Sequence, residues 1–265
     1  MCLVLIAHRA DPRYRLVLAA NRDEFFQRPT AVADYWPDTP HVLGGRDIEK
    51  GGTWLGIARN GHWAAVTNFR EGIKPPSATR SRGELVANFL GESLSPEAYL
   101  SAVQPIAERY PGFNLLAGNQ HGLHYLSNKN GGPKMLAPGI YGLSNALLDA
   151  SWPKVNRGKF ALREALAESA GPDALIETLL KALSDRTVAD DRELPSTGIG
   201  KDWEKRLSAA FIGAPGYGTR ASTVLLIARD GEVHFRERSF GEHGERIDDR
   251  RFRFAPAQTP VSAGN

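Results

Sequence analysis

The fold is decided by the stretch CLVLIAHRADPRYRLVLAANRDE, residues 2–24. Two apolar, β-branched-rich runs, residues 2–8 and 14–20, flank a hydrophilic segment that contains Pro12. Because Pro cannot continue a hydrogen-bonded ladder, this pattern predicts a β-hairpin. Both runs are apolar on both faces, which is typical of strands covered on each side. The hairpin therefore indicates a layered structure, with other elements packed above and below its sheet.

Further strands are predicted toward both ends of the chain and helices in the middle. Asn60-Gly61 and Asp230-Gly231 are strong hairpin signals, because both central residues of a type I′ turn need positive φ. The predicted strands span residues 53–58, 62–67, 114–118, 123–127, 140–143, 223–229 and 232–239. Apolar residues at three and four spacing predict helices over residues 83–92, 96–109, 157–169, 173–184 and 201–211. Hairpins at both ends with helices between them predict an α+β fold, with sheets packed together and helices outside.

The composition is that of an ordinary globular protein, and we expect one domain over residues 1–254. The tail, residues 255–265, is rich in Pro, Ala, Ser and Gly and is predicted to be flexible. The 33 basic residues are mixed with 30 acidic ones, so no basic footprint for nucleic acid is found. Even the densest stretch, residues 246–253, is interrupted by Asp248 and Asp249 and is interpreted as a solvated face.

The chain contains one cysteine and no long apolar stretch. A single Cys excludes an internal disulfide and offers no zinc-type cluster, so no metal site is predicted. The apolar run at residues 2–7 is too short for a signal-peptide core, and no uninterrupted apolar stretch of about 18 residues could span a membrane. We therefore expect a cytoplasmic protein without stable membrane insertion.

The single cysteine, Cys2, is predicted to lie at the centre of the functional site. If the hairpin is centred near Asp11, residues whose numbers sum to about 22 face each other, so Cys2 lies opposite Ala20. The polar run Asn21-Arg22-Asp23-Glu24 then surrounds the thiol with a cation, carboxylates and an amide. Once Met1 is removed, the α-amine of Cys2, with a pKa of roughly 8, could serve as general base for its own thiol. Arg22 would favour the thiolate, and Asp23 would orient the ammonium form of the amine.

An acyl-transfer site also needs hydrogen-bond donors for the developing oxyanion. Asn68 and Asn145 each follow a predicted strand, and amides at strand ends are suitable donors. Structural alternatives exist for all these residues. Asn at a strand end is commonly a turn residue, and a lone Cys is often a small buried apolar group. Asp23 and Glu24 could cap a following segment, and Arg22 could form a structural ion pair.

At Asn21-Arg22-Asp23-Glu24 the sequence resembles the NRDE family, also known as the transport and Golgi organisation 2 family. The resemblance extends in order and spacing over residues 1 to about 240. Its other motifs are Met1-Cys2, Gly51-Gly52-Thr53-Trp54-Leu55-Gly56, Thr67-Asn68-Phe69-Arg70, Ser81-Arg82-Gly83, Gly142-Leu143-Ser144-Asn145 and Tyr217-Gly218-Thr219-Arg220.

That family is similar to N-terminal nucleophile hydrolases of the bile-salt hydrolase and penicillin V acylase type. The similarity implies a four-layered αββα sandwich, with two antiparallel sheets flanked by helices. It also implies catalytic roles: Cys2 as nucleophile, Asp23 as the carboxylate near the amine, Asn68 and Asn145 as oxyanion-hole amides, and Arg220 as an active-site arginine. One position departs from the pattern, because those hydrolases carry an arginine slightly before the aspartate, where this chain has Ala19 or Ala20.

Two functions of different class follow. The first is a Cys-dependent hydrolase of a linear amide or related acyl bond, which requires no cofactor. The second is a carrier that holds haem, acyl-CoA or another amphipathic ligand in the same cleft, since eukaryotic family members are linked to haem mobilisation and to acyl-CoA or lipid homeostasis. Both functions imply a small amphipathic or anionic ligand, and the substrate-binding candidates are Asn21, Arg22, Glu24, Trp54, Arg70 and Arg82.

Haem would bind noncovalently, with Cys2 or His8 as axial ligand, because there is no Cys-x-x-Cys-His attachment motif. A third reading is a degenerate hydrolase scaffold used only for protein contact. Loss of Cys2 or Asp23 would favour that reading, and neither residue is lost. The oligomeric state is left open by the sequence.

Overall fold

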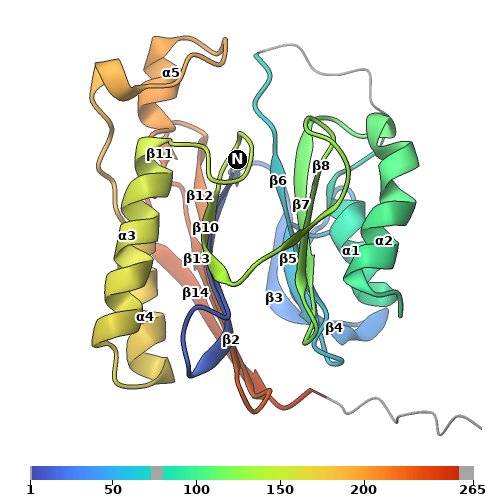
Figure 1. Ribbon diagram of the computed structural model, residues 1–265. Helices are drawn as coiled ribbons and strands as arrows, with labels where there is room; N and C mark the ends of the chain where they lie inside the picture. The colour runs from blue at the N-terminus through green and yellow to red at the C-terminus, as the bar shows by residue number, and fades with distance from the viewer. Residues whose placement is uncertain (1, 73–79, 257–265) are drawn as a thin grey trace, which may run out of the picture.

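Two antiparallel β-sheets lie face to face in the computed structural model of the chain, which describes residues 2–72 and 80–256 (Figure 1). Helices cover the outer side of each sheet, α3, α4 and α5 on one side and α1 and α2 on the other. The predicted α+β class and the αββα order of layers are confirmed. Residues 257–265 of the predicted flexible tail lie outside the described residues.

The first strand lies inside the first sheet, next to its edge strand, in the order β10-β1-β2-β12-β13-β14, with β11 paired to β12. Its strands are β1 (Cys2–His8), β2 (Tyr14–Phe25), β10 (Gly139–Leu143), β11 (Gly213–Ala214), β12 (Tyr217–Ala228), β13 (Val233–Phe240) and β14 (Arg246–Phe254). The second sheet has its strands in sequence order. They are β3 (Thr30–Trp36), β4 (Thr39–Asp47), β5 (Leu55–Ala58), β6 (Trp63–Asn68), β7 (Phe113–Gly118), β8 (Leu123–Ser127) and β9 (Lys134–Leu136).

The helices occupy the middle of the chain, as the sequence predicts. They are α1 (Gly83–Gly91), α2 (Pro96–Val103), α3 (Pro153–Glu168), α4 (Pro172–Leu183) and α5 (Lys201–Arg206), with 3-10 turns η1 (Gln104–Arg109) and η2 (Asp191–Glu193). The helix predicted over residues 96–109 is divided into α2 and η1, because Pro105 lacks the N–H that an α-helix needs. In the residues that the structure describes, no helix is both long and apolar enough to cross a membrane.

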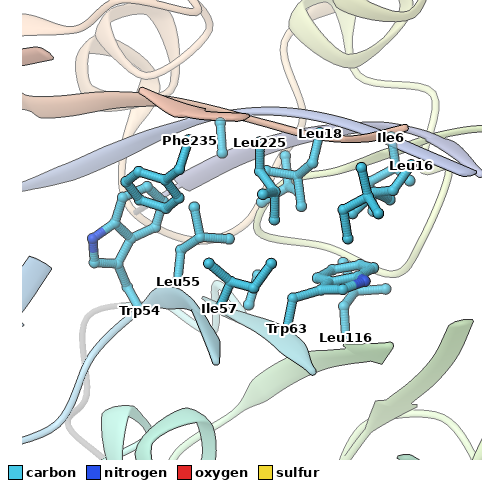
Figure 2. Packing of buried hydrophobic residues seen from close by; sticks show 14 of the residues in the cluster. Ile6, Leu16, Leu18, Trp54, Leu55, Ile57, Trp63, Leu116, Leu225 and Phe235 are labelled. Carbon is cyan, nitrogen blue, oxygen red and sulfur yellow. The ribbon is translucent and has the colours of Figure 1, made fainter. Parts of the chain in front are cut away.

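Alternation along β1 and β2 divides the core into two clusters. Val4, Ile6 and Leu18 face the second sheet, where they pack in one cluster with Leu55 and Trp63 (Figure 2). The residues between them, such as Leu3, Leu5 and Val17, pack instead in a cluster with α3 and α4. Both faces of the hairpin are thus buried, which explains why its two strands are apolar on both sides.

The two predicted turn motifs adopt a different turn from the expected type I′. Gly61 and Gly231 have φ of 83° and 99°, but Asn60 and Asp230 are not in the left-handed region. Each loop has three residues, closed by Ala58 N–H to the His62 carbonyl and by Ala228 N–H to the Glu232 carbonyl. A three-residue loop needs one left-handed residue, so only the glycine has positive φ.

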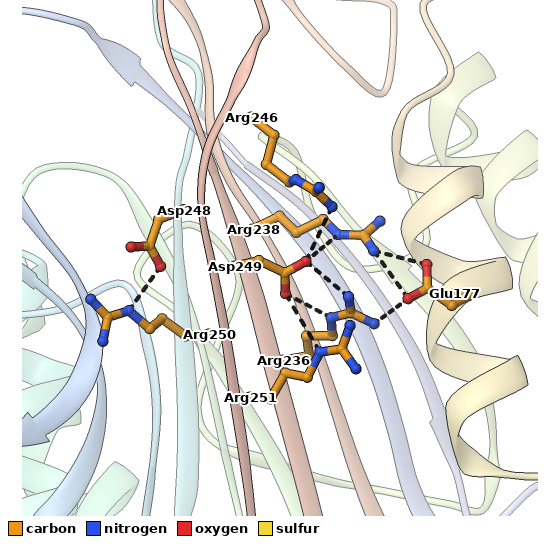
Figure 3. Close-up of polar contacts among 8 residues, drawn as sticks. All are labelled: Glu177, Arg236, Arg238, Arg246, Asp248, Asp249, Arg250 and Arg251. Atoms are coloured by element: carbon orange, nitrogen blue, oxygen red, sulfur yellow. Dashed lines mark hydrogen bonds and ion pairs between the residues drawn. The ribbon is translucent and has the colours of Figure 1, made fainter.

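Residues 246–253, predicted as a solvated face, form the edge strand β14, and an ion-pair network holds it (Figure 3). Arg236 of β13 donates to both carboxylate oxygens of Asp249 at 2.8 Å and also contacts Glu177 of α4. Arg238 bridges the same two acids, at 3.1 Å to Asp249 and 2.8 Å to Glu177. The charges of this stretch therefore join the edge of the sheet to the covering helix.

Candidate active site

The register of the first hairpin brings Cys2 opposite Arg22. The predicted partner, Ala20, pairs with Val4 instead, because the hairpin is centred on Pro12 and not on Asp11. A shift of two residues leaves every side chain on its expected face of the sheet. The motif Asn21-Arg22-Asp23-Glu24 therefore still surrounds Cys2, with Arg22 directly beside it.

Alternation along β2 sends the residues of this motif to opposite faces. Arg22 shares the inter-sheet face with Cys2, since directly paired residues of antiparallel strands project to the same side. Asn21 and Asp23 project to the helix-covered face. Asn21 donates there to the carbonyls of Leu183 and Ala210, both at 2.8 Å. The Asp23 side chain thus leaves β2 on the opposite face from the thiol and the guanidinium, near the end of the sheet.

A cleft of about 330 Å³ opens at Cys2, the first residue of β1. Its walls come from β1, β2, the β4–β5 region, the end of β6 and the start of α1. Seven of the predicted site residues line it: Cys2, Arg22, Asp23, Glu24, Trp54, Asn68 and Arg82. Asn21, Asn145, Arg70 and Arg220 lie outside this lining.

The Cys2 side chain is only 7% exposed. Burial raises the pKa of its thiol, the Asp23 carboxylate raises this pKa further, and Arg22 lowers it. The carbonyl of Cys2 accepts a hydrogen bond of 2.9 Å from the Ser144 hydroxyl. The backbone of Cys2 is therefore fixed, while its buried thiol needs a base to become a nucleophile.

Asp23 is 1% exposed and held by two neighbours on β12. Its Oδ1 accepts from the Thr219 hydroxyl at 2.7 Å, and its backbone carbonyl accepts from the Tyr217 hydroxyl at 3.1 Å. Burial raises the pKa of the Asp23 carboxyl, and the strongest opposing influence is the charge of Lys154. Asp23 is thus a buried acid whose ionisation depends on a nearby cation.

The two predicted oxyanion-hole amides lie next to each other but differ in their surroundings. Asn68 ends β6 and lines the cleft. Asn145 is 1% exposed, and its Nδ2 donates to the Asn68 carbonyl at 2.9 Å. Its Oδ1 accepts from the Ser144 hydroxyl at 3.3 Å. Asn145 therefore braces the backbone of Asn68, which presents its own side chain at the cleft.

Two of the four arginines that line the cleft, Arg22 and Arg82, interact electrostatically with Cys2. Arg22 is 6% exposed, and its Nη2 lies 3.9 Å from Glu24. Its Nη1 is buried and has no hydrogen-bond partner among the described residues. Arg82 donates from Nη1 to the Gly112 carbonyl at 3.0 Å, and burial lowers its pKa while Cys2 and Glu24 raise it. This pair gives the cleft a capacity for an anionic group.

Arg70, a predicted substrate-binding residue, lies outside the cleft lining and contacts other parts of the protein. It forms an ion pair of 2.5 Å with Glu204 of α5, and both side chains are 5% exposed. Its guanidinium lies over the Trp152 ring at 4.6 Å. The Glu204 carboxylate also accepts from Thr197. These contacts join α5 to the segment before α3.

Arg220 likewise contacts backbone rather than the cleft. Its Nη1 donates to the carbonyls of Phe25, Phe26 and Arg28 at 2.9, 3.2 and 3.1 Å. Its guanidinium lies 5.3 Å from the centre of the Phe26 ring. Arg220 therefore fixes the turn that leads from β2 to β3.

Lys154 is a buried charged residue near Asp23 that the sequence analysis does not predict. Three charged residues in the lining of the cleft are also not predicted: Arg28, Asp47 and Arg80. Lys154 lies on α3, is 2% exposed, and its pKa is lowered to about 8, chiefly by burial, while Asp23 opposes this. The predicted helix began at residue 157, so Lys154 fell outside it. Lys154, Gly158 and Leu162 lie on one face of the helix, since they are four residues apart. This face is buried, because Gly158 adjoins Leu5 and Leu162 is not exposed. A lysine on the buried face of a helix is the sequence signal that would indicate a functional role for Lys154.

Comparison with known proteins adds a family and a fold. The family model described as Transport and Golgi organisation 2 matches residues 1–242. The chain is 40% identical over 263 residues to the "Transport and Golgi organization protein 2 homolog" of Bos taurus, which covers 90% of this chain and 93% of that relative. The human homolog is 39% identical over 263 residues, with the same coverage. These matches span nearly the whole chain.

Among solved structures, the chain is similar to a mutant conjugated bile acid hydrolase from Clostridium perfringens. The TM-score is 0.51, the identity is 12%, and the match covers 95% of this chain and 92% of that chain. At this identity the likeness concerns the fold alone. It confirms the fold of N-terminal nucleophile hydrolases that the sequence resemblance implies.

Proposed function

This chain belongs to the transport and Golgi organisation 2 family, and from that premise we propose that it is a cysteine-dependent N-terminal nucleophile hydrolase. The proposed substrate carries a linear amide or a related acyl bond. One observation carries this proposal: Cys2, the first residue of β1, lies opposite Arg22 and lines one cleft together with Arg22, Arg82 and Asp23. A thiol placed only for packing would not need this set of charges.

Nucleophile and base are the thiol and the amine of one residue in this proposal. After removal of Met1, the α-amine takes the thiol proton, and the sulfur attacks the carbonyl carbon of the substrate. The side-chain amide of Asn68 donates to the oxyanion. The ammonium then gives its proton to the leaving nitrogen, the C–N bond breaks, and a thioester remains on Cys2. Water, deprotonated by the same amine, attacks the thioester carbonyl, the C–S bond breaks and the acid leaves. The ammonium then returns its proton to the sulfur and restores the thiol.

The side chains of the cleft indicate the substrate class. Arg22 and Arg82 would hold a carboxylate or phosphate of the substrate, since a guanidinium recognises both through paired N–H groups. Trp54, 8% exposed, offers an apolar wall beside them. We therefore propose an amphipathic acyl compound with an anionic group, acted on in the cytoplasm.

Intact mass and labelling test this function together. The wild type and Cys2→Ala are treated with a thiol-directed acylating probe and with a panel of anionic N-acyl amides. We expect a mass without Met1, one probe adduct in the wild type alone, and turnover that Cys2→Ala abolishes. Retained Met1, or turnover that survives in Cys2→Ala, would contradict the proposal.

A carrier function is the second candidate, and the raised pKa of the buried Cys2 thiol favours it. The two cleft arginines would then hold haem or acyl-CoA without reaction. Cys2 and His8 occupy opposite ends of β1, so only Cys2 is near this cleft as an axial ligand for haem. Titration with haem and acyl-CoA tests this alternative. The carrier function requires saturable binding that is weakened in Arg22→Met and in Arg82→Met. For acyl-CoA, binding should remain intact in Cys2→Ala.

A further inference from the structure

Lys154 occupies a position that is unfavourable for a lysine in three respects. Its side chain is 2% exposed, although lysine is almost never fully buried without a partner. It is the second residue of α3, where the helix dipole repels a positive charge. Its Nζ has no hydrogen-bond partner among the described residues. A leucine or methionine would suit this place better, so the charge needs another explanation.

The charges that face Lys154 come from three elements. Asp23 on β2 and Cys2 on β1 stabilise its ammonium form, and Arg70, which follows β6, opposes it. Arg70 is itself paired with Glu204 at 2.5 Å. By alternation, Asp23 projects from the sheet toward the layer that contains α3. Helix α3 packs against β1, the neighbour of β2, and the Asp23 carboxylate is therefore the buried anion whose charge acts on Lys154.

We propose that Lys154 is a positioning residue, whose ammonium group keeps Asp23 in the carboxylate form at the end of the sheet. The inference deepens the proposed function and rests on it in its last step, where the carboxylate orients the α-amine of Cys2. A buried carboxyl group without a nearby cation takes up a proton. A protonated Asp23 would donate that proton to the lone pair of the amine, and the amine could no longer accept the proton of the thiol.

The direct test is the titration of Asp23 by NMR in protein labelled with ¹³C at the aspartate side chains. The signal is assigned with Asp23→Asn. We expect Asp23 to be ionised at pH 7 in the wild type and in Lys154→Arg. In Lys154→Met its midpoint should rise by about one pH unit or more, a tenfold change in proton affinity. An unchanged midpoint in Lys154→Met would overturn the inference.

A matched control lies one turn further along the same helix. Lys159 pairs with Asp149 at 2.6 Å and is 18% exposed, so Lys159→Met should leave the Asp23 midpoint unchanged. A shift of the same size in Lys159→Met would also overturn the inference, because the loss of any lysine of α3 would then change the titration of Asp23. Lys154→Gln replaces Lys154→Met if the latter does not fold.

The titration needs no turnover, so the two proposals fail separately. A shifted midpoint without activity in any variant supports the Lys154–Asp23 pairing and counts against the hydrolase only. An unchanged midpoint with Cys2-dependent turnover overturns the pairing and leaves the hydrolase. Where turnover is measured, Lys154→Met should lower kcat and leave KM unchanged, and Lys154→Arg should restore kcat. If Lys154 had only a structural role, its substitution would not lower kcat while leaving KM unchanged.

Discussion

Charged residues serve opposite purposes at two places on the first sheet. Near the β14 edge, Arg236 and Arg238 each meet both Glu177 and Asp249, so their guanidinium groups are matched by carboxylates (Figure 3). By contrast, Arg22 at the cleft and Lys154 on α3 each keep a buried nitrogen without a hydrogen-bond partner among the residues described. The same kinds of side chain stabilise the fold in the first region and remain available for a ligand or a proton in the second.

The difference has a physical reason. A buried donor without a partner costs folding free energy, about 1–3 kcal/mol for a neutral group and more for a charged one. Such a cost persists where the unmatched group has a task, and sites with perturbed charges are therefore candidates for function. The comparison predicts that substitutions in the matched region change stability and that substitutions at the cleft change reactivity.

The largest effect should come from breaking a matched pair that is fully buried. Glu204→Ala leaves Arg70 charged in a place where both side chains are 5% exposed. We expect the free energy of unfolding to fall by about 3–5 kcal/mol, measured by urea denaturation. A loss below about 1 kcal/mol would contradict a structural role for this ion pair.

The next effect concerns Lys154 and depends on pH. Its pKa is lowered from 10.5 to about 8 by burial, so between these values the unfolded chain binds more protons than the folded one. The free energy of unfolding of the wild type therefore rises with pH between about 8 and 10.5, and the contribution of Lys154 to this rise is about 3 kcal/mol in total. Lys154→Met should lack this rise. Urea denaturation of both proteins at several pH values checks it, and parallel curves would contradict it.

A smaller effect should separate Arg22 from the structural arginines. Arg22 lowers the pKa of the Cys2 thiol, so Arg22→Met should raise that pKa and slow alkylation of Cys2 by iodoacetamide about tenfold at pH 7. Arg238→Met is the matched control, since it should reduce stability and leave the alkylation rate unchanged. The comparison fails if both variants slow alkylation equally.

The smallest effect is expected at Glu177, the exposed carboxylate of the ion-pair network near β14. The Glu177 side chain is 51% exposed, so solvent screens its contacts with Arg236 and Arg238. Glu177→Gln should reduce the free energy of unfolding by less than about 1 kcal/mol. Thermal unfolding in low and high salt measures this, and the difference from the wild type should shrink as salt increases.

Much of the fold could be predicted because its signals are local. The first hairpin carries its apolar pattern and its breaker Pro12 within one short stretch, and Gly61 and Gly231 mark two further turns. Strands β3 and β4 were missed because most of their residues are not fully buried, so an alternating apolar pattern is weak. Strand β14 was missed for a related reason, since long-range ion pairs stabilise its charged residues.

The site could be located from the sequence, but the tasks of its residues could not. The polar motif after β2 pointed to Cys2, and the register error of two residues did no harm because it preserved the faces of the strands. Arg70 and Arg220 resemble ligand-binding residues in the sequence, yet their partners come from Glu204 and from the β2–β3 turn. Lys154 lies before the predicted start of the helix at residue 157, and the packing of α3 onto the sheet shows that its side chain is buried.

The two neighbours of β1 are far apart in the sequence, so its pairing forms in two stages. β2 spans Tyr14–Phe25 and pairs with all of β1, from Cys2 opposite Arg22 to His8 opposite Leu16. β10 spans Gly139–Leu143, and its pairing ends with Val4 opposite Leu143. At about 5–20 residues per second, on the order of 10 s of synthesis separate the two partner strands. The edge of the sheet beside the proposed nucleophile is therefore completed well after the hairpin that carries it.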